Sequence, residues 1–181
     1  MNARIEKDFD FLTAVYFEKT YMVNLYHMTL YIDILTEEDT EQVVAMERIF
    51  YYIQNYIQSS VFINKKEKKQ IELFEKAGIS TLTLPTDPYD QIIGLILLRK
   101  FNAITEGRYN VSEIKFSSKL SADIRFHNVD EEAEEFDEDE WYNDPNLNRK
   151  STSKKSKSTK VVQFNDIEDW NKTGLVWNSW L

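Results

Sequence analysis

The chain of 181 residues contains no cysteine, two histidines, four glycines and three prolines. Without cysteine it cannot form disulfides, thiolate zinc sites or iron–sulfur clusters, and it has no cysteine nucleophile. Two histidines leave little room for a histidine-built metal site, and four glycines cannot supply a glycine-rich phosphate loop. These deficits remove several enzyme classes, and we expect no metal site and no cofactor.

The chain also lacks a long apolar run. Its most apolar stretch, 92–98, is too short to cross a bilayer and is followed by Arg99 and Lys100. The first ten residues alternate in charge, where a secretory signal would need uninterrupted apolar residues. We therefore expect a cytoplasmic protein without membrane contact. Ile, Asn, Lys, Tyr and Phe are plentiful, which suggests an AT-rich genome and a bacterial or virus-infected host cell.

Apolar residues make up 42% of the chain and aromatic residues 14%, which is enough for a folded core. The net charge of −9 argues against a domain that wraps nucleic acid, but this charge is unevenly distributed. Ten acidic residues and no basic one lie in 130–144, and six basic residues lie in 149–160. We predict a globular domain over 1–129, an acidic linker over 130–148, a flexible basic Ser/Lys-rich spacer over 149–160 and an aromatic docking segment over 161–181.

Helical and strand patterns alternate along the globular part. Helical spacing predicts helices over 36–58, 65–77 and 89–105, the last two closed by Gly78 and Gly107. Alternation and short apolar runs predict strands over 21–35, 60–63, 79–84, 111–116 and 122–129. A weaker pattern predicts a helix over 5–17. This order indicates a mixed α/β (α+β) two-layer sandwich with a charged C-terminal tail, and the ferredoxin-like fold is the preferred candidate.

The two histidines are the candidate catalytic residues, because only they titrate near neutral pH. His27 shares the polar face of its strand with Thr29, and His127 shares the polar face of another strand with Arg125. If these strands are neighbours, one imidazole could take a proton from a hydroxyl while the other protonates a leaving oxygen. Thr29 and Arg125 would then stabilise the charge on a phosphate.

The sequence His27-Met28-Thr29 resembles one His-x-Thr motif of the two-histidine phosphoesterases, a resemblance that implies phosphoesterase-like activity. The second motif of that family departs from the pattern here, because His127 is followed by Asn128 and Val129 rather than by a phosphate-binding hydroxyl. The alternative is that both histidines are surface residues of strands without a catalytic role. We favour this alternative and expect no enzymatic activity.

The aromatic segment contains three of the four tryptophans. Exposed tryptophan lowers solubility, and tryptophan is enriched where binding energy concentrates, so this segment should be buried against a protein partner or its own domain. The candidate partner-binding residues are Phe164, Ile167, Trp170, Leu175, Trp177, Trp180 and Leu181. We predict a non-enzymatic interaction or adaptor protein, such as a phage accessory or assembly factor. A homo-oligomer, a phosphoesterase and a nucleic-acid-binding module remain alternatives.

Overall fold

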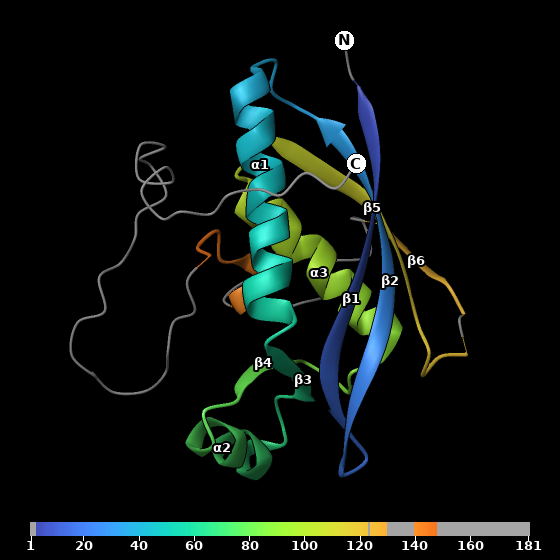
Figure 1. The fold of residues 1–181 in the computed structure, drawn as a ribbon, viewed down its shortest axis with the longest axis vertical. Coiled ribbons are helices and arrows are strands. Elements are labelled where there is room, and N and C mark those ends of the chain that lie inside the picture. Colours follow the sequence, from blue (N-terminus) through green and yellow to red (C-terminus); the bar gives the residue numbers. More distant parts are fainter. Residues whose placement is uncertain (1–2, 123, 130–139, 148–181) are drawn as a thin grey trace, which may run out of the picture. The chain divides into compact units, whose positions relative to one another are not determined.

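The computed structural model describes residues 3–122, 124–129 and 140–147. Long strands and helices occupy most of this range (Figure 1). In chain order the elements are β1 (Arg4–Phe17), β2 (Thr20–Ile34), α1 (Asp39–Tyr52), a π-helical turn (Ile53–Ile57), β3 (Ser60–Asn64), α2 (Lys68–Lys76), β4 (Ser80–Leu84), α3 (Asp90–Thr105), β5 (Tyr109–Ser118), β6 (Phe126–Val129) and a 3-10 helix (Trp141–Asn143).

The strands form one six-stranded mixed sheet in the order β4-β3-β1-β2-β5-β6. The hairpin of β1 and β2 is antiparallel and pairs over the whole length of β1, from Arg4 to Phe17. The five-residue strand β3 is parallel to β1 but pairs only with Ala14–Tyr16. As Figure 1 shows, β3 and β4 lie towards the lower end of the sheet, whereas β1 continues well past them. The hairpin is therefore much longer than β3 and β4, which have five residues each.

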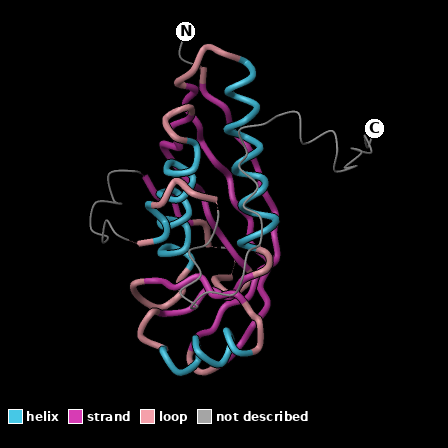
Figure 2. The backbone as a smooth tube through the Cα atoms, turned by 90° about the vertical axis from the view of Figure 1, so that its left-hand side faces the viewer, coloured by secondary structure: helices cyan, strands magenta, loops and turns pink. Residues whose placement is uncertain are grey.

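Helices α1 and α3 cover one face of the sheet (Figure 2). The Phe9 ring of β1 meets Phe50 of α1 at a centroid distance of 5.0 Å, and Tyr26 of β2 stacks on Phe116 of β5 at 5.1 Å. Gly94 lets α3 approach closely, since a Cβ there would lie 2.4 Å from the Asn128 side-chain nitrogen. The main core lies between these helices and the sheet.

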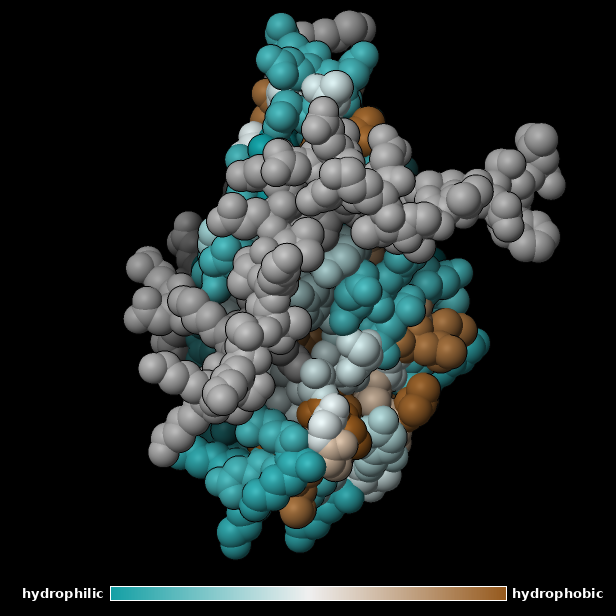
Figure 3. Space-filling model, turned by 60° about the vertical axis from the view of Figure 1, so that its left-hand side comes forward, coloured by the Kyte–Doolittle hydropathy of each residue, from teal (hydrophilic) through white to brown (hydrophobic). Residues whose placement is uncertain are grey.

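Helix α2 packs on the opposite face, at the hairpin end only. Its Phe74 is buried against Ala14 of β1 and against Val61 and Ile63 of β3. The outer side of α2 carries Lys68, Lys69, Glu72, Glu75 and Lys76, and Figure 3 shows hydrophilic side chains at this lower end of the molecule. Beyond α2, the rest of this face is formed by exposed and half-buried strand residues.

The expected mixed α/β fold is confirmed, and each of the three strongly periodic helices forms close to its predicted bounds. The expected helix over 5–17 is wrong, because these residues form β1. The domain thus begins with a hairpin, so its element order differs from the β-α-β-β-α-β order of the ferredoxin-like fold.

Residues 140–147, which we call the clip, pack on the domain. Tyr142 and Leu147 are buried, the Trp141 indole nitrogen donates to the Thr83 carbonyl of β4 at 2.8 Å, and Lys65 lies 3.1 Å from the Glu140 carboxylate. The clip belongs to the compact unit Met1–Arg149. The structure differs here from the sequence analysis, which ended the globular domain at residue 129 and extended an acidic linker to residue 148.

Candidate functional site

The face of the sheet opposite α1 and α3 holds both histidines, and we call it the open face. Strand alternation places Glu6, Asp8, Asp10 and Leu12 of β1 on this face. Their neighbours across the strands are Leu25, His27, Thr29 and Tyr31 of β2, Glu113 and Lys115 of β5, and His127 of β6. Chemically capable side chains therefore gather on an exposed sheet surface.

Directly opposite residues of β1 and β2 form polar pairs across this face. His27 Nδ1 lies 2.7 Å from Asp10 Oδ1, and the Thr29 hydroxyl donates to Asp8 Oδ1 at 2.6 Å. The His27 and Asp10 side chains are 39% and 71% exposed, so solvent weakens their attraction. The Asp10–His27 pair orients an imidazole, but it lies in water rather than in an enclosed site.

The strand order separates the two histidines. His127 of β6 lies opposite Lys115 of β5, which in turn lies opposite Thr29 of β2. Because β5 runs between β2 and β6, the histidine-bearing strands are two spacings apart, or roughly 10 Å. Each imidazole has its own carboxylate, since His127 Nδ1 lies 3.2 Å from Glu113. The register thus places both histidines on one face of the sheet but not within reach of a common ligand atom. Arg125 is exposed just before β6.

Lys100 is a buried cation that the sequence analysis did not single out. It is 3% exposed on α3, and its ammonium donates to the carbonyls of Trp141, Asp144 and Asn146 at 3.1, 2.6 and 3.1 Å. Burial lowers the pKa of Lys100 to about 8, an effect that Asp144 opposes and Arg48 reinforces. The three carbonyls use all three ammonium donors, so the arrangement fastens the clip to α3.

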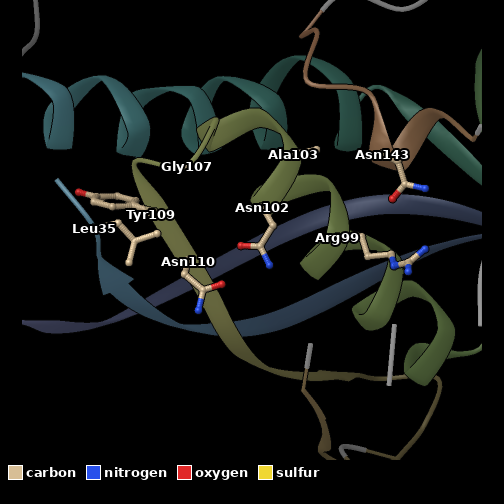
Figure 4. A pocket seen from close by; sticks show the side chains of 8 residues that line it. All are labelled: Leu35, Arg99, Asn102, Ala103, Gly107, Tyr109, Asn110 and Asn143. Carbon is tan, nitrogen blue, oxygen red and sulfur yellow. The ribbon is translucent and has the colours of Figure 1, made fainter. Parts of the chain in front are cut away.

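A shallow hollow of about 530 Å³ lies where the end of α3 meets the start of β5 (Figure 4). Asn102 projects from α3 and Asn143 approaches from the clip, as the figure shows. The Asn102 amide is already used, because it accepts from the Val111 nitrogen at 2.6 Å and donates to the Val111 oxygen at 3.1 Å. Neither histidine lines the hollow.

Apolar side chains form a strip on the open face beside α2. Leu12 lies opposite Leu25, and the same side of β2 continues through Val23 to Tyr21. Leu12, Tyr21 and Val23 are 55%, 50% and 64% exposed. The Tyr21 ring meets Phe74 of α2 at 5.9 Å, so the strip ends against that helix. We call Leu12, Tyr21, Val23 and Leu25 the apolar strip.

The seven candidate partner-binding residues of segment 161–181 lie outside the described residues. In the part of the chain that the structure describes, His, Asp and Glu side chains do not form groups of three or more suited to holding a metal ion. Across the same residues, no helix has the length and apolar character needed to cross a membrane.

No family model and no curated protein matches the chain. Among solved structures, the chain is similar to the crystal structure of uncharacterized protein WS1659 from Wolinella succinogenes, with a TM-score of 0.51 and 12% sequence identity. The match covers 72% of this chain and 99% of that chain. At this identity the similarity shows the fold alone.

The sequence contains a signal for two features that its analysis missed, the buried cation Lys100 and the clip. Lys100 falls seven residues after Ile93 and four before Ile104, so helical periodicity places it on the buried stripe of α3. A lysine at such a position needs acceptors. The adjacent aromatic residues Trp141 and Tyr142 interrupt the acidic stretch and mark the clip that supplies them.

Proposed function

We propose that this protein is a non-enzymatic interaction protein that binds a partner protein through its α/β domain together with the aromatic segment 161–181. The observation that carries the proposal is the apolar strip. Val23 and Leu12 are more than half exposed on a sheet face, next to α2 and in line with charged residues. Contiguous exposed apolar surface rimmed by polar side chains is typical of protein–protein contact sites.

The arrangement of the polar residues supports contact rather than catalysis. A phosphate between His27 and His127 would need both imidazoles within hydrogen-bond reach, and the intervening strand β5 keeps their strands apart. Thr29 is engaged with Asp8, and the Lys115 ammonium donates to the Tyr31 hydroxyl. These side chains are paired with one another across a flat, exposed surface.

The proposal is tested by partner capture from the native host with the full chain and the variants Leu12→Lys and Val23→Lys. Leu35→Lys is the matched control, because Leu35 is similarly exposed (59%) but lies in the loop after β2, at the end of the hairpin away from its turn. We expect at least one protein to be retained by the full chain and by Leu35→Lys, and to be lost with either strip variant. Thermal unfolding of each variant should stay close to that of the full chain, since these positions are exposed.

A second arm removes the tail. The truncated chain should end at Arg149, because an end at residue 129 would also remove Tyr142 and Leu147 from the core. Loss of the partner from the chain ending at Arg149 would support a role for segment 161–181. If the full chain, strip variants and truncation all retain the same proteins in equal amount, the proposed function is wrong.

A further inference from the structure

We propose that the unpaired edge of β1, residues 4–13, accepts an extended segment of a partner protein that carries Lys or Arg at every second position, with apolar residues between. This inference rests on the proposed function, and it adds a second surface and the chemistry of what binds there. The partner segment would join the sheet as a further strand beside β1, a mode known as β-augmentation.

The pairing of β1 leaves this edge open. Its neighbours in the sheet are β2, which pairs with it throughout, and β3, which pairs only with Ala14–Tyr16. Within the described residues, no strand pairs with the outer edge of residues 4–13. Ten residues of strand present an edge roughly 34 Å long. Natural proteins rarely leave so long an edge without a cover or a use.

The hydrogen-bond phase identifies which backbone groups point outwards. The Ile34 nitrogen donates to the Ala3 carbonyl at 3.0 Å, and these two residues continue the register in which Arg4 lies opposite Asp33. In an antiparallel ladder, alternate residues bond to the partner strand. The backbone N–H and C=O groups of odd-numbered β1 residues therefore bond to β2. Those of Glu6, Asp8, Asp10 and Leu12 point to the open edge instead.

Charge determines the partner's residues on the open face. Glu6, Asp8 and Asp10 are exposed there, and their side chains bond to Tyr31, Thr29 and His27 at 3.2, 2.6 and 2.7 Å. The Thr29 hydroxyl is neutral and leaves the Asp8 charge uncompensated, whereas Glu6 has Lys115 nearby, bonded to the Tyr31 hydroxyl. The added strand would place every second side chain opposite this acidic row. Lys or Arg at those positions would complete the pairs.

The other face of the edge determines the intervening residues. Phe9 and Phe11 of β1 are buried there, and Phe50 of α1 packs on Phe9. Val43 is exposed on α1 and precedes Phe50 by seven residues, so it lies on the same side of the helix. Apolar side chains of the added strand would extend this surface alongside α1.

A second copy of this chain does not fit the acidic part of the edge. Opposite residues of a continuous sheet share a face, so the carboxylate row of one copy would meet that of the other. Every two-fold register centred between Glu6 and Asp10 places at least one pair of carboxylates opposite each other. The charges that block this self-association are the ones that favour a basic strand.

The test uses the full chain and a capped synthetic peptide, Lys-Val-Lys-Thr-Lys-Val-Lys. One control peptide has Glu in place of each Lys, and another has the same composition with its four Lys residues in one block. We expect only the alternating Lys peptide to bind, in an amide chemical-shift titration. Binding should slow hydrogen exchange at the amides of Glu6, Asp8, Asp10 and Leu12, while the odd-numbered amides of β1 are already protected by β2.

Matched variants separate the edge from the rest of the open face. The affinity for the alternating Lys peptide should fall about tenfold in a triple edge variant that combines Glu6→Gln, Asp8→Asn and Asp10→Asn. A loss of this size is expected for three exposed ion pairs. Asp33→Asn with Glu113→Gln neutralises carboxylates on the same face but on β2 and β5, and should change the affinity less than twofold. Asp8→Pro should weaken binding beyond Asp8→Asn, because proline removes an outward N–H that β2 does not use.

No binding at millimolar peptide, equal binding of the block peptide, or binding without slower exchange at the even-numbered amides would overturn the inference. The proposed function fails differently. If Val23→Lys abolishes partner capture while the triple edge variant retains the partner and the peptide does not bind, the protein acts by contact but not through this edge.

Discussion

Replacing Tyr142 by alanine should lower the free energy of unfolding by about 3 kcal/mol, because the clip is part of the cooperative fold. Tyr142 is 1% exposed, and truncation of a fully buried aromatic residue costs about 3–5 kcal/mol. The lower end of that range is the least that we expect, since Lys100 and Trp141 hold the clip by hydrogen bonds and limit the collapse that would fill the space left by the ring. The loss would be a large share of the 5–15 kcal/mol typical of a domain.

Urea unfolding of the full chain, followed by circular dichroism, measures this loss. A domain of this size loses about 2 kcal/mol of stability per molar urea, so the midpoint should fall by about 1.5 M. Tyr89→Ala is the matched control, because the Tyr89 ring is 55% exposed and meets the Phe17 ring at 5.3 Å. Its truncation should cost less than half as much as that of Tyr142.

The reasoning would be refuted by a Tyr142→Ala chain that unfolds within about 0.5 kcal/mol of the unaltered chain, the range of ordinary surface changes. The clip would then be a surface attachment without a share in the core. A midpoint that falls equally for Tyr142→Ala and Tyr89→Ala would count against it too, because burial would not be the cause.

Three further outcomes test other parts of the fold. Burial lowers the pKa of Lys100 from 10.5 to about 8, so the unfolded chain binds more protons between these values. Between pH 8 and pH 10.5 this group should therefore raise the free energy of unfolding by up to about 1.4 kcal/mol per pH unit. Urea unfolding of the Lys100→Met variant should not show this rise. Gly94→Ala should destabilise by about 1–2 kcal/mol, and adding Asn128→Ala should recover part of this loss, because the new Cβ would meet the Asn128 side chain. His27→Ala should change the free energy of unfolding by less than about 0.5 kcal/mol in the same assay, since its pair with Asp10 is exposed.

Periodicity correctly predicted the elements that bury one continuous face. It assigned residues 5–17 to a helix rather than to β1 for a physical reason. From Arg4 to Thr13 exposed residues alternate with half-buried or buried ones, but Thr13, Ala14 and Val15 are buried in succession. The alternation ends there because α2 covers the open-face side of β1 at Ala14 while the main core covers Val15. A strand that changes from one covered face to two has no single period, so its pattern also resembles a helix.

Strand order was beyond the reach of periodicity. Alternation placed His27 and His127 on polar faces, and the register puts both on the open face. Whether two strands are neighbours depends on tertiary pairing, and here β5 lies between them. The clip was missed because the ten acidic residues of 130–144 outnumber the three aromatic ones in that range, although Tyr142 is buried in the core.

The difference in length between the hairpin and its neighbours links both proposed contact surfaces. Since β3 and β4 have only five residues each, they and α2 can cover β1 only near Ala14–Tyr16. Within the part of the chain that the structure describes, the remainder of β1 keeps an open edge, and the same side of β2 keeps an uncovered face. On the open face of this part of β1, the side chains are charged at Glu6, Asp8 and Asp10 and become apolar at Leu12. A partner that uses both surfaces must therefore have a matching order, with a basic extended segment beside residues 4–10 and an apolar contact over Leu12 and Val23.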